Sequence, residues 1–296
     1  GFLLEHFWWG SVFLLTLPVA AVALALAVIV VPSHVNESTD PVDNLGGVLS
    51  VVLVAGLVLG INFAPVPGET ALALGLGAVA LAAAVGFVIR QRRAPSPLYD
   101  LRVAGRRVFW VAALAGIIVF GSLMAAMFVG QQFLQNVHDY SAVEAGAAIL
   151  PAAVFMVLVA PSSAKLVEAR GSRVTLLIGS GALLAGFVVM LVLWAEHSPY
   201  WHVGLAYALV GIGVGIAGTP ASRSLPASTP VTRAGMASGT ADLQRDLGGA
   251  IMQSIMGAVL AAGYTAAMAT AVAGAPNPTE LTDGVQAQLE KSFGSA

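Results

Sequence analysis

The sequence is dominated by eight blocks of apolar residues, separated by short polar stretches. Each block is close to the ~20 residues that a helix needs to cross about 30 Å of hydrocarbon. Backbone N–H and C=O groups find no water in lipid, so each block must pair these groups internally, as a helix does. We therefore predict an all-α, polytopic transmembrane helical bundle. The predicted spans are residues 7–31, 46–63, 71–89, 108–134, 145–164, 174–195, 201–222 and 236–264.

The composition excludes several classes of protein. Only 9% of the residues are charged and 58% are apolar, whereas a soluble domain carries roughly 25% charged residues. The net charge of −2 offers no electrostatic footprint for nucleic acid. With no cysteine, the chain has no disulfide, thiolate metal site or cysteine nucleophile. His138, His197 and His202 lack metal-ligand spacing and no H-E-x-x-H motif occurs, so no metal, cofactor or enzyme activity is expected.

Basic residues occur in alternate connections between the predicted spans. By the positive-inside rule, the connections that carry them are cytoplasmic. We therefore predict that the odd-numbered connections are cytoplasmic and that both chain ends lie outside the cell. The first connection is acidic and does not contribute to this assignment. The basic residues are Arg90, Arg92, Arg93, Arg102, Arg106 and Arg107 in the third connection, Lys165, Arg170 and Arg173 in the fifth, and Arg223 and Arg233 in the seventh.

The beginning of the chain does not resemble the start of a membrane protein. It reads Gly1-Phe2-Leu3-Leu4, with no Met, basic flank or cleavage motif. An outside N-terminus needs a signal to reach that side, so we expect an upstream part of the protein to be missing. Trp8 and Trp9 open the first span, as aromatic residues do at a membrane interface.

Three segments resemble one family of transporters. They are FWWGSVFLLTLPVAAVALAL (Phe7 to Leu26), QQFLQNVHDYSAVEAGAAILP (Gln131 to Pro151) and AGMASGTADLQRDLGGAIMQS (Ala234 to Ser254). In order and spacing they are similar to the 14-span drug:proton antiporters of the major facilitator superfamily. The resemblance runs from that family's sixth span to its thirteenth, which implies a fragment with a partial major facilitator fold.

The resemblance also implies how the chain is divided. Residues 1–107 would hold the last span of the N-terminal bundle, two linker spans and a basic cytoplasmic loop. Residues 108–264 would hold five spans of the C-terminal bundle, and residues 265–296 an outside loop before a missing last span. A segment of the fifth connection resembles the degenerate second copy of the superfamily's cytoplasmic loop motif. Its motif residues are Lys165, Arg170, Gly171 and Arg173.

The last predicted span is the only one that contains charged residues. A carboxylate deep in a bilayer costs about 2.5–3.5 kcal/mol on insertion scales, so it is a functional hypothesis by default. The four-residue spacing of Asp242 and Asp246 places both on one helical face, which Gly249 and Gln253 continue. Both acids also fall on acidic positions of the quaternary ammonium exporters that the chain resembles. We therefore predict that Asp246 and Asp242 couple transport to protons.

Arg245 keeps a second interpretation open. It lies three residues from Asp242, so the two could form a buried structural ion pair that fixes helix packing. A further acidic position of the quaternary ammonium exporters corresponds to Met156 here, and at that position the chain departs from their pattern.

Adaptable and polar side chains at the outer end of the fourth span predict a cavity for flat apolar cations. Met and Phe offer polarizable and cation–π surfaces. The alternative is that these side chains face lipid or other helices and that the amides mark the membrane interface. The candidate cavity residues are Met124, Phe128, Gln131, Gln132, Gln135 and Gln253.

The seventh span contains a run of glycines. Its G-x-G-like string lies inside an apolar span, where no nucleotide site is expected. Gly211 and Gly215 instead form a small-xxx-small pair, which predicts close contact with another helix.

These patterns together predict a proton-coupled secondary antiporter of a bacterial plasma membrane, which exports lipophilic, cationic compounds by alternating access. Its partners would be the lipid bilayer, protons and small lipophilic or cationic substrates. Two alternatives stay open. One is an exporter of an endogenous lipid or metabolite, and the other is a nonfunctional truncated remnant or scaffold.

The predicted topology can be tested with single cysteines, because the chain has none of its own. Cysteines placed at Ser96 in the third connection and at Ser198 in the sixth should react with an impermeant thiol reagent from opposite sides of the membrane. Labelling of both from the same side would contradict the predicted orientation.

Overall fold

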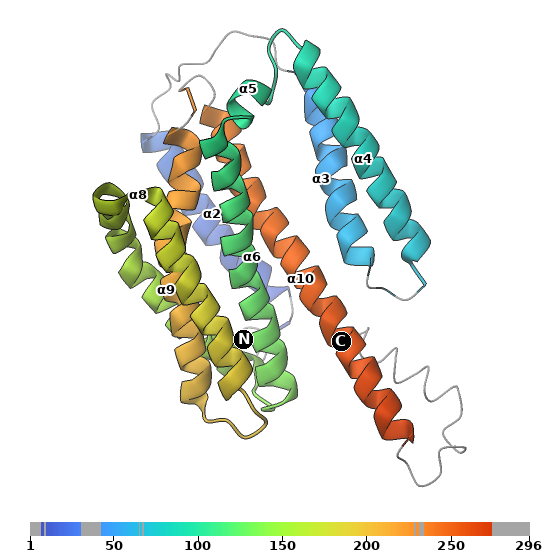
Figure 1. Cartoon of the computed structure of the whole chain (residues 1–296), viewed down its shortest axis with the longest axis vertical. Helices are drawn as coiled ribbons and strands as arrows, with labels where there is room; N and C mark the ends of the chain where they lie inside the picture. The colour runs from blue at the N-terminus through green and yellow to red at the C-terminus, as the bar shows by residue number, and fades with distance from the viewer. Residues whose placement is uncertain are drawn as a thin grey trace.

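The computed structural model describes residues 7–8, 10–30, 43–64, 66, 68–227, 229–230 and 234–273. Within these ranges the chain is helical and has no strand (Figure 1). This confirms the predicted all-α bundle. Trp9, Arg233 and residues 1–4 and 274–296, which enter the sequence interpretation, lie outside the described residues.

The helices correspond closely to the predicted spans. Six helical stretches are long and apolar enough to cross a membrane, and a shorter apolar helix covers Thr16–Val30. The helices are α2 (Ser11–Val30), α3 (Asn44–Phe63), α4 (Thr70–Arg93), α5 (Leu101–Ala104), α6 (Arg107–Asn136), α7 (Ala142–Ala148), α8 (Leu150–Leu193), α9 (Tyr200–Ala227) and α10 (Ala234–Ala273).

The two predicted spans 145–164 and 174–195 are separate helical segments that meet at a kink in α8. Together with α7 they cover 52 residues from Ala142 to Leu193, more than twice the ~20 residues that cross the hydrocarbon. The connection expected between the two spans is helical except at Gly171, where φ is 81° and ψ is 162°. Because glycine adopts a positive φ without a Cβ penalty, this one residue breaks α8 into a first arm (150–170) and a second arm (172–193).

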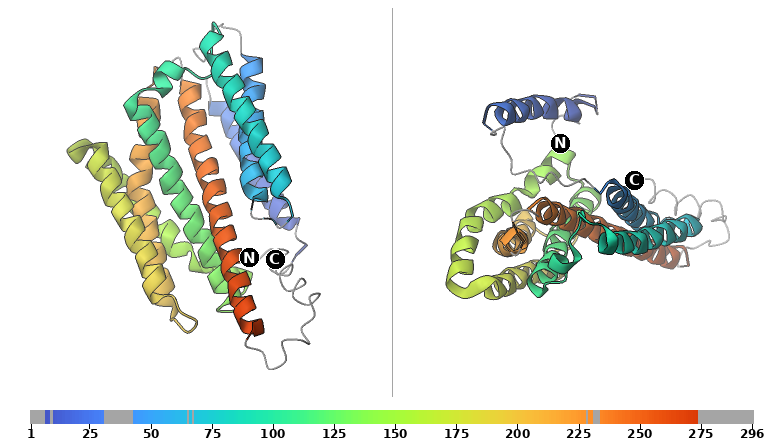
Figure 2. Two further views of the ribbon diagram at one scale, coloured as in Figure 1. Left: turned by 45° about the vertical axis from the view of Figure 1, so that its right-hand side comes forward. Right: turned by 90° about the horizontal axis from the view of Figure 1, so that it is seen from above.

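Helix α9 is the central helix of the bundle. Its most apolar stretch is 67% buried, against 11–33% in the other long spans. The view from above in Figure 2 shows α9 inside the arc that α8 forms. The two arms of α8 therefore cover different sides of the same helix.

Glycines on α9 bring its backbone against both arms of α8. A Cβ on Gly211 would overlap the carbonyl of Ala152, and one on Gly215 would lie 2.8 Å from the carbonyl oxygen of Met156, both on the first arm. A Cβ on Gly213 would lie 2.8 Å from the carbonyl oxygen of Gly179 on the second arm. The predicted close packing at Gly211 and Gly215 is therefore present, and Gly213 extends it to the opposite side.

The antiparallel pair α3 and α4 forms a separate hairpin beside the main bundle (Figures 1 and 2). A Cβ on Gly56 of α3 would lie 3.1 Å from the carbonyl oxygen of Leu76 on α4. The hairpin meets α10 where the hydroxyl of Ser254 donates to Asn62 Oδ1 at 3.2 Å. Helix α2 stands apart in the view from above, and its described side chains are exposed apart from the half-buried Ser11.

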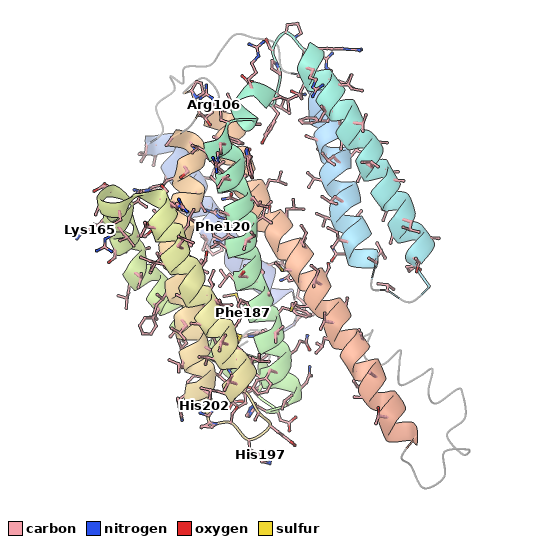
Figure 3. All side chains as sticks on the ribbon, in the orientation of Figure 1. Arg106, Phe120, Lys165, Phe187, His197 and His202 are labelled. Carbon is pink, nitrogen blue, oxygen red and sulfur yellow. The ribbon has the colours of Figure 1, made fainter. Side chains whose placement is uncertain are left out.

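The ends of the helices separate the two sets of connections. In Figure 3, Arg106 and Lys165 lie toward one end of the molecule, and His197 and His202 lie at the other end. The first two residues belong to odd-numbered connections and the last two to the sixth connection and its border. This arrangement agrees with the alternation on which the predicted orientation rests.

The packing of α9 on the second arm of α8 predicts unequal effects of two neighbouring substitutions. A Cβ on Gly179 would lie 2.6 Å from the Cβ of Ala217, whereas one on Gly181 meets nothing within 4 Å. We expect Gly179→Ala to cost about 1–3 kcal/mol through overpacking. Gly181→Ala should be neutral or stabilise the helix by up to ~1 kcal/mol.

Thermal unfolding of the purified protein in detergent measures both effects. Gly181→Ala is the matched control, since it adds the same methyl group two residues away. Equal melting temperatures for the two variants would show that the α8–α9 contact is not close-packed.

Candidate functional site

The two acids of α10 lie on the face opposite to its contact with α6. Gln244 and Gly248 are buried, and a Cβ on Gly248 would lie 3.1 Å from the backbone nitrogen of Gly121 on α6. At 100° per residue, Asp242 and Asp246 project roughly 160° away from Gln244 on either side of the helix. Both acids are exposed. The side chains of the two acids therefore project away from α6.

Asp242 and Arg245 form the predicted ion pair, but the pair is not buried. Arg245 Nη1 lies 3.6 Å from Asp242 Oδ1, and the two side chains are 52% and 72% exposed. The guanidinium of Arg245 also lies 5.1 Å from the ring centroid of Phe120 on α6. An exposed pair of this kind contributes about 0–1 kcal/mol. The interpretation of a buried structural pair therefore does not hold in the described chain.

The polar stripe on α10 is shorter than its sequence suggests. Gln253 is exposed, as expected for a continuation of the acidic face. Gly249 is buried instead, and a Cβ on it would lie 3.1 Å from Cγ of Met124 on α6. The close approach of the two helices turns this glycine into a packing position. The described polar face therefore consists of Asp242, Arg245, Asp246 and Gln253.

Three of the candidate cavity residues of α6 contact other helices. Met124 packs beside Gly249, and the ring of Phe128 reaches within 3.9 Å of a Cβ built on Gly257 of α10. Gln131 Nε2 donates to the carbonyl of Ala145 at 3.1 Å. These side chains join helices to one another, as the alternative interpretation proposed for the Met and Phe residues.

The amides at the end of α6 are linked along the helix. Gln135 Nε2 donates to Gln131 Oε1 at 2.7 Å, and Asn136 Nδ2 donates to Gln132 Oε1 at 2.6 Å. Gln132 also lines a groove.

An apolar groove lies between the C-terminal halves of α6 and α10. Its volume is about 660 Å³, within the range of roughly 300–1,000 Å³ that is typical of small-molecule sites. Its lining contains no charged side chain, and its amides come from Gln132 and Asn136. The other lining residues are Val129, Phe133, Val137, Met256, Val259, Leu260, Gly263, Tyr264 and Ala267.

The residues of the predicted cytoplasmic loop motif lie at the break of α8. Lys165, Arg170, Gly171 and Arg173 are all exposed there. The hydroxyl of Thr175 donates to the carbonyl of Gly171 at 3.0 Å. Three positive charges therefore surround the residue at which the chain reverses.

The comparisons with known proteins identify the family. A sequence profile of the Major Facilitator Superfamily matches residues 1–253. The chain belongs to the major facilitator superfamily. This places it among membrane transporters rather than enzymes, as a multi-pass protein of the plasma membrane. The division into bundles and linker spans stays a prediction.

Several relatives within the superfamily carry names that refer to drugs. The chain is 32% identical over 272 residues to the multidrug resistance protein Stp of Mycobacterium tuberculosis, covering 90% of this chain and 50% of that protein. It is 27% identical to the multidrug efflux pump LfrA of Mycolicibacterium smegmatis, covering 89% and 52%. It is 26% identical to the quinolone resistance protein NorB of Staphylococcus aureus, covering 86% and 55%. The chain thus spans about half the length of the curated relatives it matches.

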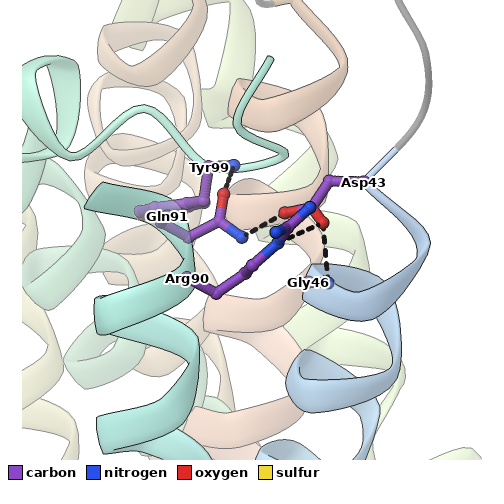
Figure 4. Close-up of polar contacts among 5 residues, drawn as sticks. All are labelled: Asp43, Gly46, Arg90, Gln91 and Tyr99. Atoms are coloured by element: carbon purple, nitrogen blue, oxygen red, sulfur yellow. Dashed lines mark hydrogen bonds and ion pairs between the residues drawn. The ribbon is translucent and has the colours of Figure 1, made fainter. Parts of the chain in front are cut away.

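This member of the superfamily also contains a polar cluster that was not predicted from the sequence (Figure 4). Asp43 is the N-cap of α3 and is buried. Arg90 Nε donates to Asp43 Oδ1 at 2.8 Å, and Gln91 Nε2 donates to Asp43 Oδ2 at 2.9 Å. The N–H of Gly46 donates to Oδ1 at 3.1 Å. An Asp directly before an apolar run was the available signal, since Asp is a preferred N-cap.

The cluster connects the α3–α4 hairpin to the start of α10. The N–H of Tyr99 donates to Gln91 Oε1 at 2.9 Å, and the hydroxyl of Thr240 on α10 lies 3.5 Å from Tyr99 Oη. Asp43 and Arg90 belong to the first and third connections, so their contact agrees with placing both connections on one side of the membrane.

The Asp43 cluster predicts a pH-dependent contribution to stability. Burial raises the pKa of Asp43, but the hydrogen bonds from Arg90, Gly46 and Gln91 and the charge of Arg90 outweigh it and hold the pKa below its ordinary value of 3.8. Asp43→Asn keeps the N-cap and loses the charge, so it should lower the melting temperature at neutral pH. The difference in melting temperature between the variant and the parent should be complete above about pH 3.8. It should disappear as the pH falls through the lowered pKa of Asp43.

A matched control for this variant is Glu69→Gln. Glu69 is the N-cap of the other helix of the hairpin and makes no side-chain cap hydrogen bond. Its replacement should leave the melting temperature unchanged both at neutral pH and at the low pH where the effect of Asp43→Asn disappears. A loss that is as large for Glu69→Gln as for Asp43→Asn would contradict the role of the cluster.

Proposed function

We propose that this chain is part of a proton-coupled antiporter that exports lipophilic, cationic compounds by alternating access. The observation that carries the proposal is the polar face of α10. Asp246 lies there one helical turn from Asp242 and directly after Arg245, and it has no ion-pair partner among the described residues. The names of the relatives, which refer to drug efflux and resistance, support the export of drug-like compounds.

Asp246 is suited to exchange a proton for a cation. A carboxylate that carries no permanent counter-ion can be neutralised either by a proton or by a positively charged substrate. Binding of one therefore favours release of the other, and the two ligands cross the membrane in opposite directions. Asp242 is less suited because Arg245 lies 3.6 Å from it. We assign the main coupling role to Asp246 and a secondary role to Asp242.

The groove between α6 and α10 supports the lipophilic part of the substrate class. Its lining is apolar apart from the amides of Gln132 and Asn136 and the side chain of Tyr264. Phe133 and Met256 offer surfaces that adapt to flat molecules. In this proposal the groove receives the lipophilic compound, while the acids, ten or more residues nearer the N-terminus of α10, couple its export to protons.

The uncharged lining of the groove also suits an endogenous lipid or metabolite, which is a second candidate substrate. Competition distinguishes the two. A lipophilic dye cation that is displaced by other cations of unrelated shape indicates drug export, whereas displacement by one class of native lipid alone indicates the second function.

The coupling role predicts the effect of Asp246→Asn in the intact transporter. Asn keeps the size of the side chain but cannot cycle a proton, so pH-gradient-driven export should be abolished while substrate binding and folded yield are preserved. Asp242→Asn should reduce export less. Its folded yield should stay close to that of the parent, because the ion pair it removes is exposed.

Proton release on addition of substrate to purified protein in detergent is the deciding measurement. The parent should release protons and Asp246→Asn should release fewer or none. Release by Asp246→Asn equal to that of the parent would show that coupling resides elsewhere. Gln253→Glu is not a substitute for this test, since it adds a third acid to the same face.

A further inference from the structure

Gln244 is the most unusual buried residue of α10. Its side chain is 1% exposed, although it lies between the exposed residues Asp242 and Asp246 in the sequence. Neither Oε1 nor Nε2 has a hydrogen-bond partner among the described residues. A buried donor or acceptor without a partner carries its full desolvation penalty, so the amide destabilises the arrangement in which it is found.

Glycines allow α6 and α10 to pack closely around this amide. A Cβ on Gly116 of α6 would overlap the amide of Gln244, so the side chain occupies the space that Gly116 leaves. One helical turn further, a Cβ on Gly121 would lie 2.8 Å from the carbonyl oxygen of Gly248. The two backbones therefore approach too closely for a third helix or a lipid chain to reach the amide.

The missing hydrogen bonds can thus be formed only when α10 moves relative to α6 or when water enters between them. Polar groups lie along the same face of α10, in the direction of its N-terminus. Thr240 is one turn away and buried, and its hydroxyl lies 3.5 Å from Tyr99 Oη. Opening of the α6–α10 contact would give the amide access to these hydroxyls and to water from that end.

We propose that Gln244 is a positioning residue that keeps the contact between α6 and α10 reversible. We call the arrangement in which α6 and α10 are in contact closed. The amide makes this arrangement less stable than an apolar side chain of the same shape would, and so it favours separation of α10 from α6. Asp242 and Asp246 lie on the same helix and move with it. The inference rests on the proposed function only in assigning a purpose to this movement, since opening itself can be measured without transport.

Gln244→Met tests the inference, because Met has a similar length and makes no demand for hydrogen bonds. We expect the melting temperature to rise by a few degrees. Opening is reported by Ala237→Cys, a position on the same face of α10 that is 0% exposed. Maleimide labelling of this single cysteine should be roughly tenfold slower in the Gln244→Met background, since a change of 1.4 kcal/mol in the opening equilibrium corresponds to a factor of ten.

Ser238→Cys is the matched control, since Ser238 is the next residue along the chain and is exposed. Its labelling should be equally fast in both backgrounds. Equal labelling of Ala237→Cys in both backgrounds would overturn the inference. A lower melting temperature for Gln244→Met would also overturn it, because it would show that the amide is already satisfied in the closed arrangement.

A size exchange provides a second test that does not depend on the folding of Gln244→Met. Gly116→Ala alone should lower the melting temperature, because its methyl group competes with the amide for the same space. Gly116→Ala combined with Gln244→Ala should recover most of that loss. Additive effects of the two substitutions would mean that the side chains do not share this space. This result would refute the proposed location of the Gln244 amide beside Gly116.

The purpose of the movement is tested by export in the intact transporter. Gln244→Met should lower the maximal rate of export and leave the substrate concentration for half-maximal rate almost unchanged. A parental export rate together with slowed labelling would refute the link between opening and transport. Failure of the proposed function is recognised separately, as unchanged proton release by Asp246→Asn.

Discussion

Close contact between helix backbones at glycine is the interaction on which this bundle depends. Lipid tails are as apolar as the side chains they surround, so the hydrophobic effect does not press one membrane helix against another. Van der Waals contact has to supply the association, and it is greatest where no side chain keeps the backbones apart. Gly211 and Gly215 receive the first arm of α8 and Gly213 receives the second. The break at Gly171 returns the second arm to the helix that the first arm already covers.

The polar face of α10 follows from the same kind of contact. Gly248 brings α10 against α6, and Gln244 fills the space beside Gly116, which commits one side of the helix to packing. Residues two positions away from this side necessarily point away from α6. Asp242 and Asp246 are such residues. Their exposure is therefore a geometric consequence of where the glycines lie, and a substitution in the contact would reorient the acids without touching them.

The sequence predicts the spans well because the signal for a membrane helix is its length in apolar residues, which does not depend on what surrounds it. The polar residues between the fifth and sixth spans predict a connection there, and the chain does reverse within it. Helical hydrogen bonding nevertheless continues to Gly171 and resumes directly after it, so the turn is made at one residue. The pairing of Gly211 and Gly215 with another helix was predictable, but the helix that they contact was not.

The candidate site was less predictable because it depends on which faces of the helices meet. Asp43 and Arg90 are 47 residues apart, and only the antiparallel packing of α3 on α4 brings them together. Gly249 has the sequence spacing of the polar stripe, yet it packs beside Met124. The exposure of the Asp242–Arg245 pair likewise depends on the position of α6 and not on the local sequence. Helical spacing defines which residues share a face, but it does not determine what that face contacts.

Energetics decides what can lie against the acidic face of α10 in a membrane. Each charged side chain placed against hydrocarbon costs about 2.5–3.5 kcal/mol on insertion scales. The exposed ion pair of Asp242 and Arg245 stabilises the protein by only about 0–1 kcal/mol. Facing lipid is therefore unfavourable for this part of α10, and water or other protein must cover it. The curated relatives are about twice as long as the stretch they share with this chain, so those proteins have further chain available to cover such a face. A carboxylate enclosed in this way, but still reached by water from one side at a time, meets the physical requirement for exchanging a proton against a cation.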